Sequence, residues 1–375
     1  MEQDPFRRNI LKTFDYLHSH PELSWEEKNT TDYIRMHLEK AGCIVRTFSD
    51  CTGVIGDFGN FNGDHPKIAF RADMDALWQE VNGISQPNHS CGHDAHMTIM
   101  LGVLWKLAEN PELKDKIAVR FIFQPAEEVG SGALAMVERG VIETIDYLFG
   151  VHLRPKAETP NGFATPAILH GATWTVEFDI LGEDAHGARP HLTKNAIDIG
   201  THIVTALYTI HLDPTVPYSV KVTKFQAGGF STNIIPGQAS LAIDLRAQTN
   251  ELMEVLRVKV YGTLQAAEQL FDTEIAITND YGIVAAKVHP DAEKIAHKAI
   301  AKTLGVKKTN PPLLTPGGDD FHFYTIKKPT IKATMIGLGC DLEPGLHHPD
   351  MTFDKEAIFN GIDIFTEITR TIYDI

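Results

Sequence analysis

The sequence predicts an α/β protein in which a domain with a mostly parallel sheet is interrupted by a smaller α+β domain. Through residues 53–153, short apolar runs typical of strands alternate with helical segments, which favours parallel strands joined by crossover helices. From 173 to 285 the order becomes strand, helix, strand, strand, helix, strand, as in a ferredoxin-like fold. A helix-rich α/β pattern then resumes. We therefore expect residues 1–172 and 286–375 to form one discontinuous domain and residues 173–285 to form an inserted, lid-like domain.

Helical spacing of apolar residues marks two helices near the N-terminus, at 5–19 and 25–41. Ser24 is expected to cap the second helix and Gly42 to end it. Strand-like runs follow at GVIGDFG (53–59), KIAFRADMD (67–75), AVRFIFQPAEE (118–128) and DYLFGVHL (146–153). The helices expected between the last three strands span 96–109 and 132–139.

The inserted segment is expected to contain four strands and two helices. The strands cover 173–182, 219–229, 239–248 and 273–282, and the helices cover 195–210 and 250–270. This order predicts one small split-βαβ domain.

The composition indicates a globular protein that acts on small molecules. Of the 375 residues, 43% are hydrophobic and 22% are charged, which is enough apolar content for a sizeable core. The formal net charge is -15, and there is no cluster of basic residues to neutralise a phosphate backbone. A small-molecule substrate is therefore expected, and a nucleic-acid partner is not.

Targeting and cysteine patterns favour a cytoplasmic protein without a membrane partner. The N-terminus lacks the apolar core of a secretory signal, and no run of about 18 apolar residues could span a bilayer. The four widely spaced cysteines favour reduced thiols or a metal ligand over a disulfide framework. No second cysteine lies at a Cys-x-x-Cys spacing from Cys91, so a thiol-dependent redox enzyme is not favoured.

The stretch NHSCGHDAHM (88–97) concentrates residue types that bind metal ions. Cysteine, histidine and carboxylate side chains bind zinc, manganese, cobalt or nickel, and the glycine between Cys91 and His93 lets the backbone turn both side chains towards one ion. The alternative is a reactive or merely structural thiol near surface histidines. His96, at the start of a helix, is expected to support or cap the site rather than to bind the ion directly.

Further candidate ligands follow the strands of the expected parallel sheet. Glu127 and Glu128 come after one strand, His152 lies at the end of another, and Asp73 and Asp75 follow an earlier one. In open α/β sheets the ligand lies beyond the carboxyl ends of the strands, so these side chains are expected to lie together. Adjacent buried carboxylates repel each other unless a cation lies beside them, and one can bind the metal while the other acts as a base.

A series of motifs, in the right order over nearly the whole chain, resembles the aminoacylase and carboxypeptidase family of dinuclear metallohydrolases. The motifs are HSHPELSWEE (18–27), RADMDAL (71–77), HSCGHDAHM (89–97), FQPAEEVGSGA (123–133), GVHL (150–153), DAHGARPH (184–191), TNIIPGQASLAIDLR (232–246) and GLHHPDMTF (345–353). The family includes hippurate hydrolase, auxin-conjugate hydrolase and N-acetyl-amino-acid deacetylases. The resemblance implies two divalent metal ions (zinc, manganese, cobalt or nickel) and a lid domain through which chains form a homodimer or homotetramer.

The resemblance also implies roles for individual residues of the metal site. The implied ligands are Cys91, His93, Glu128, His152 and His347, with the thiolate as a bridge between the ions. In GLHHPD the matching histidine is His347, and His348 occupies a variable position. Glu127 matches the catalytic glutamate.

In the inserted domain, the resemblance implies residues that act on the substrate. His186 is implied to approach the reacting carbonyl, and Asn233 and Arg246 are implied to hold the substrate's carboxylate. The alternatives are a strand-end cap for Asn233 and a solvated strand charge for Arg246.

The chain departs from the family pattern in two places. After RADMDAL the family usually has a proline-containing stretch lining the substrate pocket, whereas this chain has Trp78 and Gln79. Asp319 in GGDDF replaces a glutamate with a shorter side chain. The first departure bears on the shape of the pocket and the second on the support of the site.

Together these features predict a metal-dependent amidohydrolase that cleaves N-acyl, above all N-acetyl, amino acids into a carboxylate and a free amino acid. A divalent ion lowers the pKa of water from about 15.7 to near 7, and Glu127 is expected to take the proton and pass it to the leaving amine. A dipeptidase or carboxypeptidase would use the same site. A non-catalytic, metal-stabilised binding protein is the alternative from another class, and it gives Glu127 no role.

Overall fold

The computed structural model describes residues 4–375, and the chain divides into two compact units. The first unit runs through Leu169 and also contains Lys287–Leu314 and Asp319–Ile375, and the second contains His170–Ala286 with Thr315–Gly318. Each unit has its own cluster of buried apolar residues.

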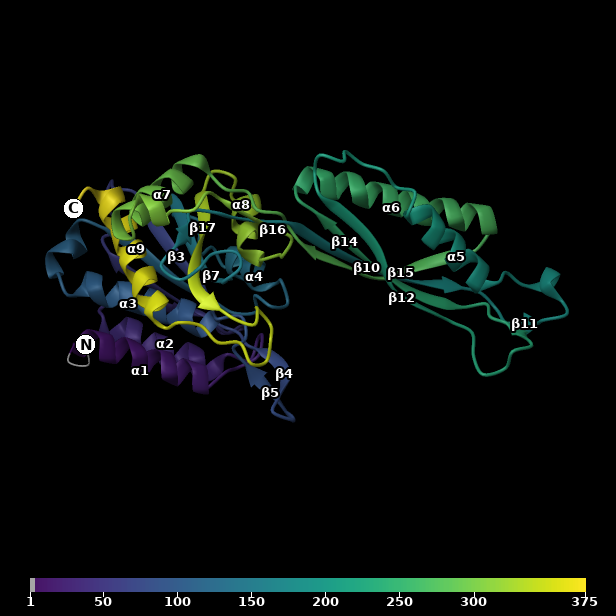
Figure 1. Ribbon diagram of the computed structural model, residues 1–375, viewed down its shortest axis with the longest axis horizontal. Coiled ribbons are helices and arrows are strands. Elements are labelled where there is room, and N and C mark those ends of the chain that lie inside the picture. The colour runs from purple at the N-terminus through teal and green to yellow at the C-terminus, as the bar shows by residue number, and fades with distance from the viewer. Residues whose placement is uncertain (1–3) are drawn as a thin grey trace. The chain divides into compact units, whose positions relative to one another are not determined.

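A seven-stranded sheet forms the centre of the first unit (Figure 1). Its order is β1 (Ile44–Thr47), β2 (Val54–Gly59), β6 (Ala118–Gln124), β3 (Ile68–Asp73), β7 (Tyr147–Pro155), β17 (Lys332–Leu342) and β8 (Ala164–Thr165). Strands β6, β3, β7 and β17 are parallel, whereas β1, β2 and β8 pair antiparallel at the sides. The predicted α/β fold with a mostly parallel sheet is confirmed in the middle of the sheet, and the antiparallel edges are additions to it.

Helices lie against both faces of this sheet, so its middle strands are buried on both sides. Phe149 and Val151 of β7 belong to the apolar cluster that includes α3 and α9, whereas Gly150 between them faces Phe321 on the other side. The helices of this unit are α1 (Pro5–Ser19), α2 (Lys28–Lys40), α3 (His93–Ala108), α4 (Gly132–Glu138), α7 (Pro290–Thr303), α8 (Phe323–Lys327) and α9 (Glu356–Tyr373). Its 3₁₀ turns are η1 (Pro111–Asp115), η3 (Val306–Lys308) and η4 (Asp320–His322).

Two helices begin three residues away from the positions that the sequence predicted. Helix α3 begins at His93 rather than 96, because Gly92, with φ of 87°, turns the chain through the left-handed region directly before it. Helix α2 begins at Lys28 rather than 25. The predicted cap, Ser24, instead donates a hydrogen bond to Asp75 Oδ2 at 2.6 Å, so it belongs to the network at the end of β3.

Strands β4 (Leu77–Val81) and β5 (Ile84–Asn88) form a hairpin that was not predicted from the sequence, and Figure 1 shows it projecting from the first unit. Asn82 and Gly83 form its turn with φ of 53° and 80°. An Asn-Gly pair between strand-like residues is the usual signal for such a turn. A further two-stranded sheet pairs β9 (Ile168–His170) with β16 (Leu313–Thr315).

The second unit is an antiparallel sheet of four strands in the order β12, β14, β10, β15, with two helices packed on one face. Along the chain its elements are β10 (Ala172–Leu181), β11 (Ala185–His186), η2 (Pro190–Leu192), α5 (Ala196–Leu207), β12 (Tyr218–Ala227), β13 (Ile234–Ile235), β14 (Ala239–Ala247), α6 (Asn250–Phe271) and β15 (Glu274–Ile283). The main elements follow the predicted β-α-β-β-α-β order of a ferredoxin-like fold.

Across residues 4–375, none of the helices combines the length and apolar character needed to cross a bilayer.

Candidate metal centre and active site

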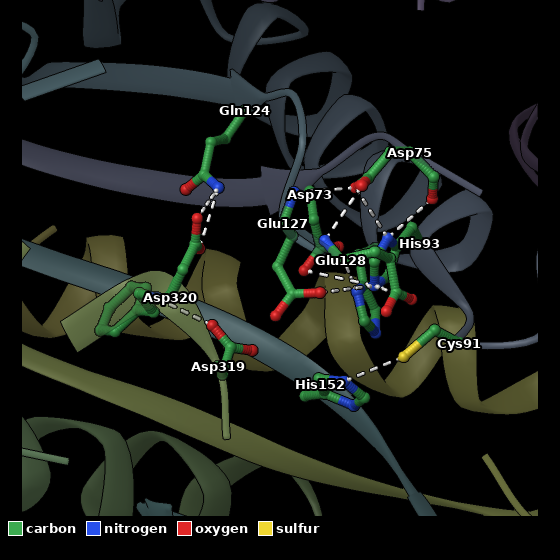
Figure 2. Close-up of polar contacts among 12 residues, drawn as sticks. Asp73, Asp75, Cys91, His93, Gln124, Glu127, Glu128, His152, Asp319 and Asp320 are labelled. Carbon is green, nitrogen blue, oxygen red and sulfur yellow. Dashed lines mark hydrogen bonds and ion pairs between the residues drawn. The ribbon is translucent and has the colours of Figure 1, made fainter. Parts of the chain in front are cut away.

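The structure brings the five predicted metal ligands together beyond the carboxyl ends of the parallel strands, as two groups of three that share one cysteine. The first group is Cys91, His93 and His152, and the second is Cys91, Glu128 and His347. In each group, one donor atom from each residue lies within 4.8 Å of the others. Figure 2 shows Cys91, His93, Glu128 and His152 pointing towards one another.

His93, the first residue of α3, directs one ring nitrogen into this cluster. Its Nδ1 donates to the main-chain oxygen of Asp75 at 2.8 Å, which directs Nε2 towards the carboxylates. Nε2 lies 3.8 Å from Glu127 Oε2 and 3.8 Å from Glu128 Oε1, and it forms no hydrogen bond within the described residues. A buried polar atom without a partner costs about 1–3 kcal/mol, and a bound cation would remove that cost.

His152 on β7 is oriented in the same way. Its Nδ1 donates to the main-chain oxygen of Leu153 at 2.7 Å, which leaves Nε2 facing Cys91 Sγ at 3.5 Å. Burial lowers the pKa of His152, and the imidazole is therefore neutral, the form that binds metals. Burial and the nearby Glu128 raise the pKa of the Cys91 thiol well above its usual value, so a cation is needed to hold it as a thiolate.

Asp75 orients the two glutamates that follow β6. Its carboxylate accepts a hydrogen bond from the N–H of Glu127 at 3.1 Å and from the N–H of Glu128 at 3.0 Å. The hydroxyl of Ser24 donates a third bond to the same carboxylate. The sequence places Asp75 at a strand end without indicating this role, because its hydrogen-bond partners come from distant parts of the chain.

Glu27 holds the same turn from its other side. Glu27 Oε1 accepts from the N–H of Ala126 at 2.9 Å, and Oε2 accepts from the hydroxyl of Thr52 at 2.5 Å. Ala126 has φ of 53°, a left-handed conformation that is unfavourable for a residue with a side chain. Burial raises the pKa of Glu27 to about 7. The sequence placed Glu27 in a motif without indicating this function.

The two glutamates themselves lie where negative charge is unfavourable. Burial, then Asp319 and Glu128, raises the pKa of Glu127 well above its usual value. Burial likewise raises the pKa of Glu128 to about 7, and its Oε1 has no hydrogen-bond partner within the described residues. A divalent cation beside them would offset both effects. The donor types, the unpartnered atoms and the excess negative charge therefore fit a metal centre.

His96 supports the cluster but has no lone pair left for an ion. Its Nε2 accepts from the N–H of Leu153 at 3.0 Å, so Nδ1 carries the proton and donates to Asp73 Oδ1 at 2.7 Å. Asp73, His93 and His96 do lie within 4.8 Å of one another, but both nitrogens of His96 are already used. The expected supporting role of His96 is the one that this geometry favours.

A buried arginine lies behind the carboxylates. The guanidinium of Arg71 donates to Asp73 at 2.5 Å, to Asp320 at 2.8 Å and to Gln124 at 2.9 Å. Each of these side chains is fully buried. This network fixes the ends of β3 and β6 relative to η4.

Asp319, the shortened position of the family pattern, lies against the proposed base. Its Oδ1 accepts from the N–H of Phe321 at 2.8 Å and so caps η4, whereas its Oδ2 has no partner within the described residues. Carboxylate oxygens of Glu127, Asp319 and Asp320 lie within 4.8 Å of one another.

Of the two adjacent histidines in GLHHPD, the structure brings His347 to the cluster. His347 Nε2 lies 3.5 Å from Glu128 Oε2. His348 Nδ1 instead accepts from the N–H of Asp350 at 3.1 Å, and His348 belongs to neither group of donors.

The three residues predicted to act on the substrate lie in the second unit and are exposed. His186 Nδ1 accepts from the N–H of Ala188 at 3.0 Å, which leaves an Nε2–H as a donor to other molecules. Asn233 lies beside it, since its carbonyl accepts from the residue after His186 at 2.7 Å. Arg246 is on β14, where its Nε and Nη2, which form one edge of the guanidinium, donate to the two carboxylate oxygens of Asp244 at 2.8 and 2.9 Å.

The chain belongs to peptidase family M20/M25/M40, which its residues 69–371 match. The predicted family of metallohydrolases is thereby confirmed, and the protein is an enzyme of the hydrolase class.

Its relatives are named as deacetylases, amino-acid hydrolases and carboxypeptidases. An N-acetyl-L-cysteine deacetylase from Bacillus subtilis is 29% identical over 379 residues, which cover 96% of this chain and 87% of that protein. IAA-amino acid hydrolase ILR1-like 2 from Arabidopsis thaliana is 34% identical over 329 residues, 84% of this chain and 74% of that protein. Thermostable carboxypeptidase 1 from Saccharolobus solfataricus is 31% identical over 346 residues, 85% of this chain and 84% of that protein.

Two solved structures share the fold. A dinuclear metal-binding peptidase of the M20 family from Bacillus subtilis has a TM-score of 0.80 and 28% identity, with 98% of this chain and 99% of that chain covered. An aminobenzoyl-glutamate utilization protein from Klebsiella pneumoniae has a TM-score of 0.76 and 20% identity, with 97% of each chain covered. The candidate donors and the dinuclear relative support divalent metal binding by this chain.

Proposed function

We propose that the protein is a metal-dependent amidohydrolase that cleaves N-acyl amino acids, with N-acetyl amino acids as the first candidates, into a carboxylate and a free amino acid. The observation that carries the proposal is the pair of donor groups that share Cys91. Glu127 lies beside these two groups but is a member of neither, so it is available for proton transfer. The relatives named N-acetyl-L-cysteine deacetylase and IAA-amino acid hydrolase support the substrate class.

Two ions are proposed, one held by Cys91, His93 and His152 and the other by Cys91, Glu128 and His347. The ligand types suit zinc, manganese, cobalt or nickel. When bound, such ions polarise the amide carbonyl and lower the pKa of water, so that hydrolysis proceeds near neutral pH.

Glu127 is proposed to move the proton. It takes a proton from the attacking water and returns it to the nitrogen of the leaving amine, as general base and then general acid. Its burial supports this role, because a raised pKa brings a carboxylate closer to the pH at which it must exchange protons.

The second unit is proposed to supply substrate contacts. The outward Nε2–H of His186 would donate a hydrogen bond to the carbonyl oxygen as negative charge develops there. Asn233 and Arg246 would hold the substrate's carboxylate, with Asp244 keeping the guanidinium in place.

We also propose that residues 173–285 form the lid through which chains assemble as a homodimer or homotetramer. Sedimentation equilibrium tests this, and a single-chain mass would contradict it.

A dipeptidase or carboxypeptidase is the second candidate, favoured by the relative named Thermostable carboxypeptidase 1. Its substrate would use the same ions and the same glutamate. Only the groups that recognise the acyl side of the scissile bond would differ.

The test is amino-acid release from N-acetyl, N-benzoyl and dipeptide substrates by protein stripped of metal and reloaded with Mn²⁺, Zn²⁺, Co²⁺ or Ni²⁺. The proposal expects metal-dependent release from the acyl amino acids that is lost in Glu127→Gln. Release only from dipeptides would favour the second candidate. No release with any ion that binds would contradict both.

A further inference from the structure

The loop that carries His347 is tied to the hairpin β4–β5 by two side-chain amides. Gln79 Nε2 donates to the main-chain oxygen of His347 at 2.7 Å. Asn88 Nδ2 donates to Gln79 Oε1 at 3.1 Å and to the main-chain oxygen of Pro349 at 3.0 Å. The amides therefore form one connected network that ends on two carbonyls of the loop.

The pairing of the hairpin explains why these two residues meet. Leu77 pairs with Asn88 and Gln79 pairs with Gln86, so Gln79 and Asn88 are diagonal neighbours on one face. Trp78 points to the opposite face and is 61% exposed. Of the two residues that depart from the family pattern here, Gln79 therefore reaches the metal-site loop.

His347 adopts a main-chain conformation that needs outside support. Its φ is 63°, and such a conformation costs a residue with a side chain on the order of 1–3 kcal/mol. The N–H of His347 donates to the main-chain oxygen of Ser90 at 2.8 Å, while its carbonyl accepts from Gln79. Both polar groups of the residue's backbone are thus held, and the Ser90 contact lies directly before Cys91.

The ring of His347 lacks the hydrogen bond that holds the rings of the other two histidines in place. His93 and His152 each donate Nδ1–H to a main-chain oxygen, which fixes the direction of Nε2. The ring of His347 forms no hydrogen bond with residues 4–375, and its side chain is 54% exposed. The direction of its Nε2 therefore depends on the main chain that carries it.

We propose that Gln79, braced by Asn88, is a positioning residue that holds His347 in the conformation needed to complete its group of metal ligands. The inference rests on the proposed function, because it takes His347 as a ligand. Loss of the Gln79 amide would let the loop relax and turn the imidazole away from Glu128. One ion would then be bound more weakly, while the ion beside His93 and His152 would keep its ligands.

The test compares Gln79→Ala with Gln86→Ala, in Co²⁺-loaded full-length protein titrated with a competing chelator. Gln86 is the same residue type, lies opposite Gln79 in the hairpin and is exposed, and its side chain forms no hydrogen bond with the described residues of the loop, so it is the matched control. Gln79→Ala is expected to bind one of two Co²⁺ ions about ten- to a hundredfold more weakly, with a changed visible spectrum for that ion. Thermal unfolding of the metal-stripped protein and binding of the other ion should match those of Gln86→Ala.

Two further variants make the outcome decisive. Gln79→Glu keeps the size of the side chain but sets an oxygen against the carbonyl of His347, so it should weaken the same ion. His347→Ala measures the full loss of that ligand. If His347→Ala weakens one ion and Gln79→Ala does not, the positioning role is overturned and the proposed metal site stands. If His347→Ala leaves both ions bound as in the parent, the proposed site fails and the inference fails with it.

Discussion

The residues proposed to take part in catalysis differ in burial and in hydrogen bonding between the two units. In the first unit, Cys91, Glu127 and two of the histidines are buried and the side chain of Glu128 is 8% exposed, and atoms such as His93 Nε2 have no hydrogen-bond partner within the described residues. In the second unit, His186, Asn233 and Arg246 are exposed, and Arg246 is already paired with Asp244. The buried polar groups of the first unit are unfavourable without a cation. The exposed side chains of the second unit can instead form hydrogen bonds with water and with neighbouring residues.

This difference predicts how each unit responds to change. Removing the ion or a residue of the buried cluster should alter metal binding, stability or the chemical step. Removing an exposed residue of the second unit should alter substrate binding or, for His186, the chemical step, and should leave metal binding unchanged.

The largest effect is expected from Glu127→Gln, which keeps the shape of the side chain but cannot take a proton. We expect kcat to fall by about 10²- to 10⁴-fold, the range for loss of a general acid–base group. Metal content measured on the same preparation should equal that of the parent, since neither donor group requires Glu127. Activity within a few-fold of the parent would contradict its proposed role.

Metal removal should destabilise one unit selectively. A ligand present at about 1,000 times its Kd stabilises the folded state by about 4 kcal/mol, and a chelator would remove that contribution. Hydrogen exchange followed by mass spectrometry should show lost protection in peptides that contain α3 and the segment after β6. Peptides from β14 and α6 serve as the internal control. Equal loss of protection in these peptides would contradict the claim that the metal stabilises the first unit selectively.

The pH dependence of the free energy of unfolding should reveal the raised pKa of Glu27. Its pKa is about 7 in the folded protein against 4.5 for the free side chain, so the unfolded chain releases this proton first as the pH rises. The contribution of Glu27 is therefore fully present below pH 4.5 and is lost between 4.5 and about 7. At about 1.36 kcal/mol per pKa unit, the loss approaches about 3 kcal/mol.

Glu27→Gln has no proton to lose in this range. In chelator-treated samples, denaturant unfolding should show the variant gaining stability relative to the parent as the pH rises from 4.5 to 7. A stability difference that does not vary with pH would show that the pKa of Glu27 is ordinary.

The smallest effect is expected from Arg246→Ala. Loss of a charge-assisted hydrogen bond to the substrate should raise KM by about tenfold or more, with metal content unchanged. Lys259→Ala, an exposed cation on α6 of the same unit, is the control for a general change in surface charge. An unchanged KM would favour the other interpretation of Arg246, that of a strand charge paired with Asp244.

The sequence was most informative where function depends on the ends of strands. The alternation of strands and helices predicted that Glu127, Glu128 and His152 would meet, because carboxyl ends of parallel strands share one edge of the sheet. The glycine in CGH pointed to the turn that directs Cys91 and His93 into the cluster.

The supporting contacts were not predictable in this way. Glu27 and Gln79 act through hydrogen bonds to main-chain groups far away in sequence, and no local pattern marks such bonds. The hairpin that carries Gln79 did have a local signal, the Asn82-Gly83 pair, which was not used. The predicted cap at Ser24 was wrong because its hydroxyl bonds to Asp75.

The most direct test of the account is the number of Co²⁺ ions bound by Cys91→Ala, His152→Ala and His347→Ala. Because Cys91 belongs to both donor groups, we predict that the parent binds two ions per chain and that Cys91→Ala weakens both. His152→Ala and His347→Ala should each weaken one ion, and not the same one. Two ions bound by Cys91→Ala with the affinity of the parent would contradict the central claim that the two metal sites share this thiolate.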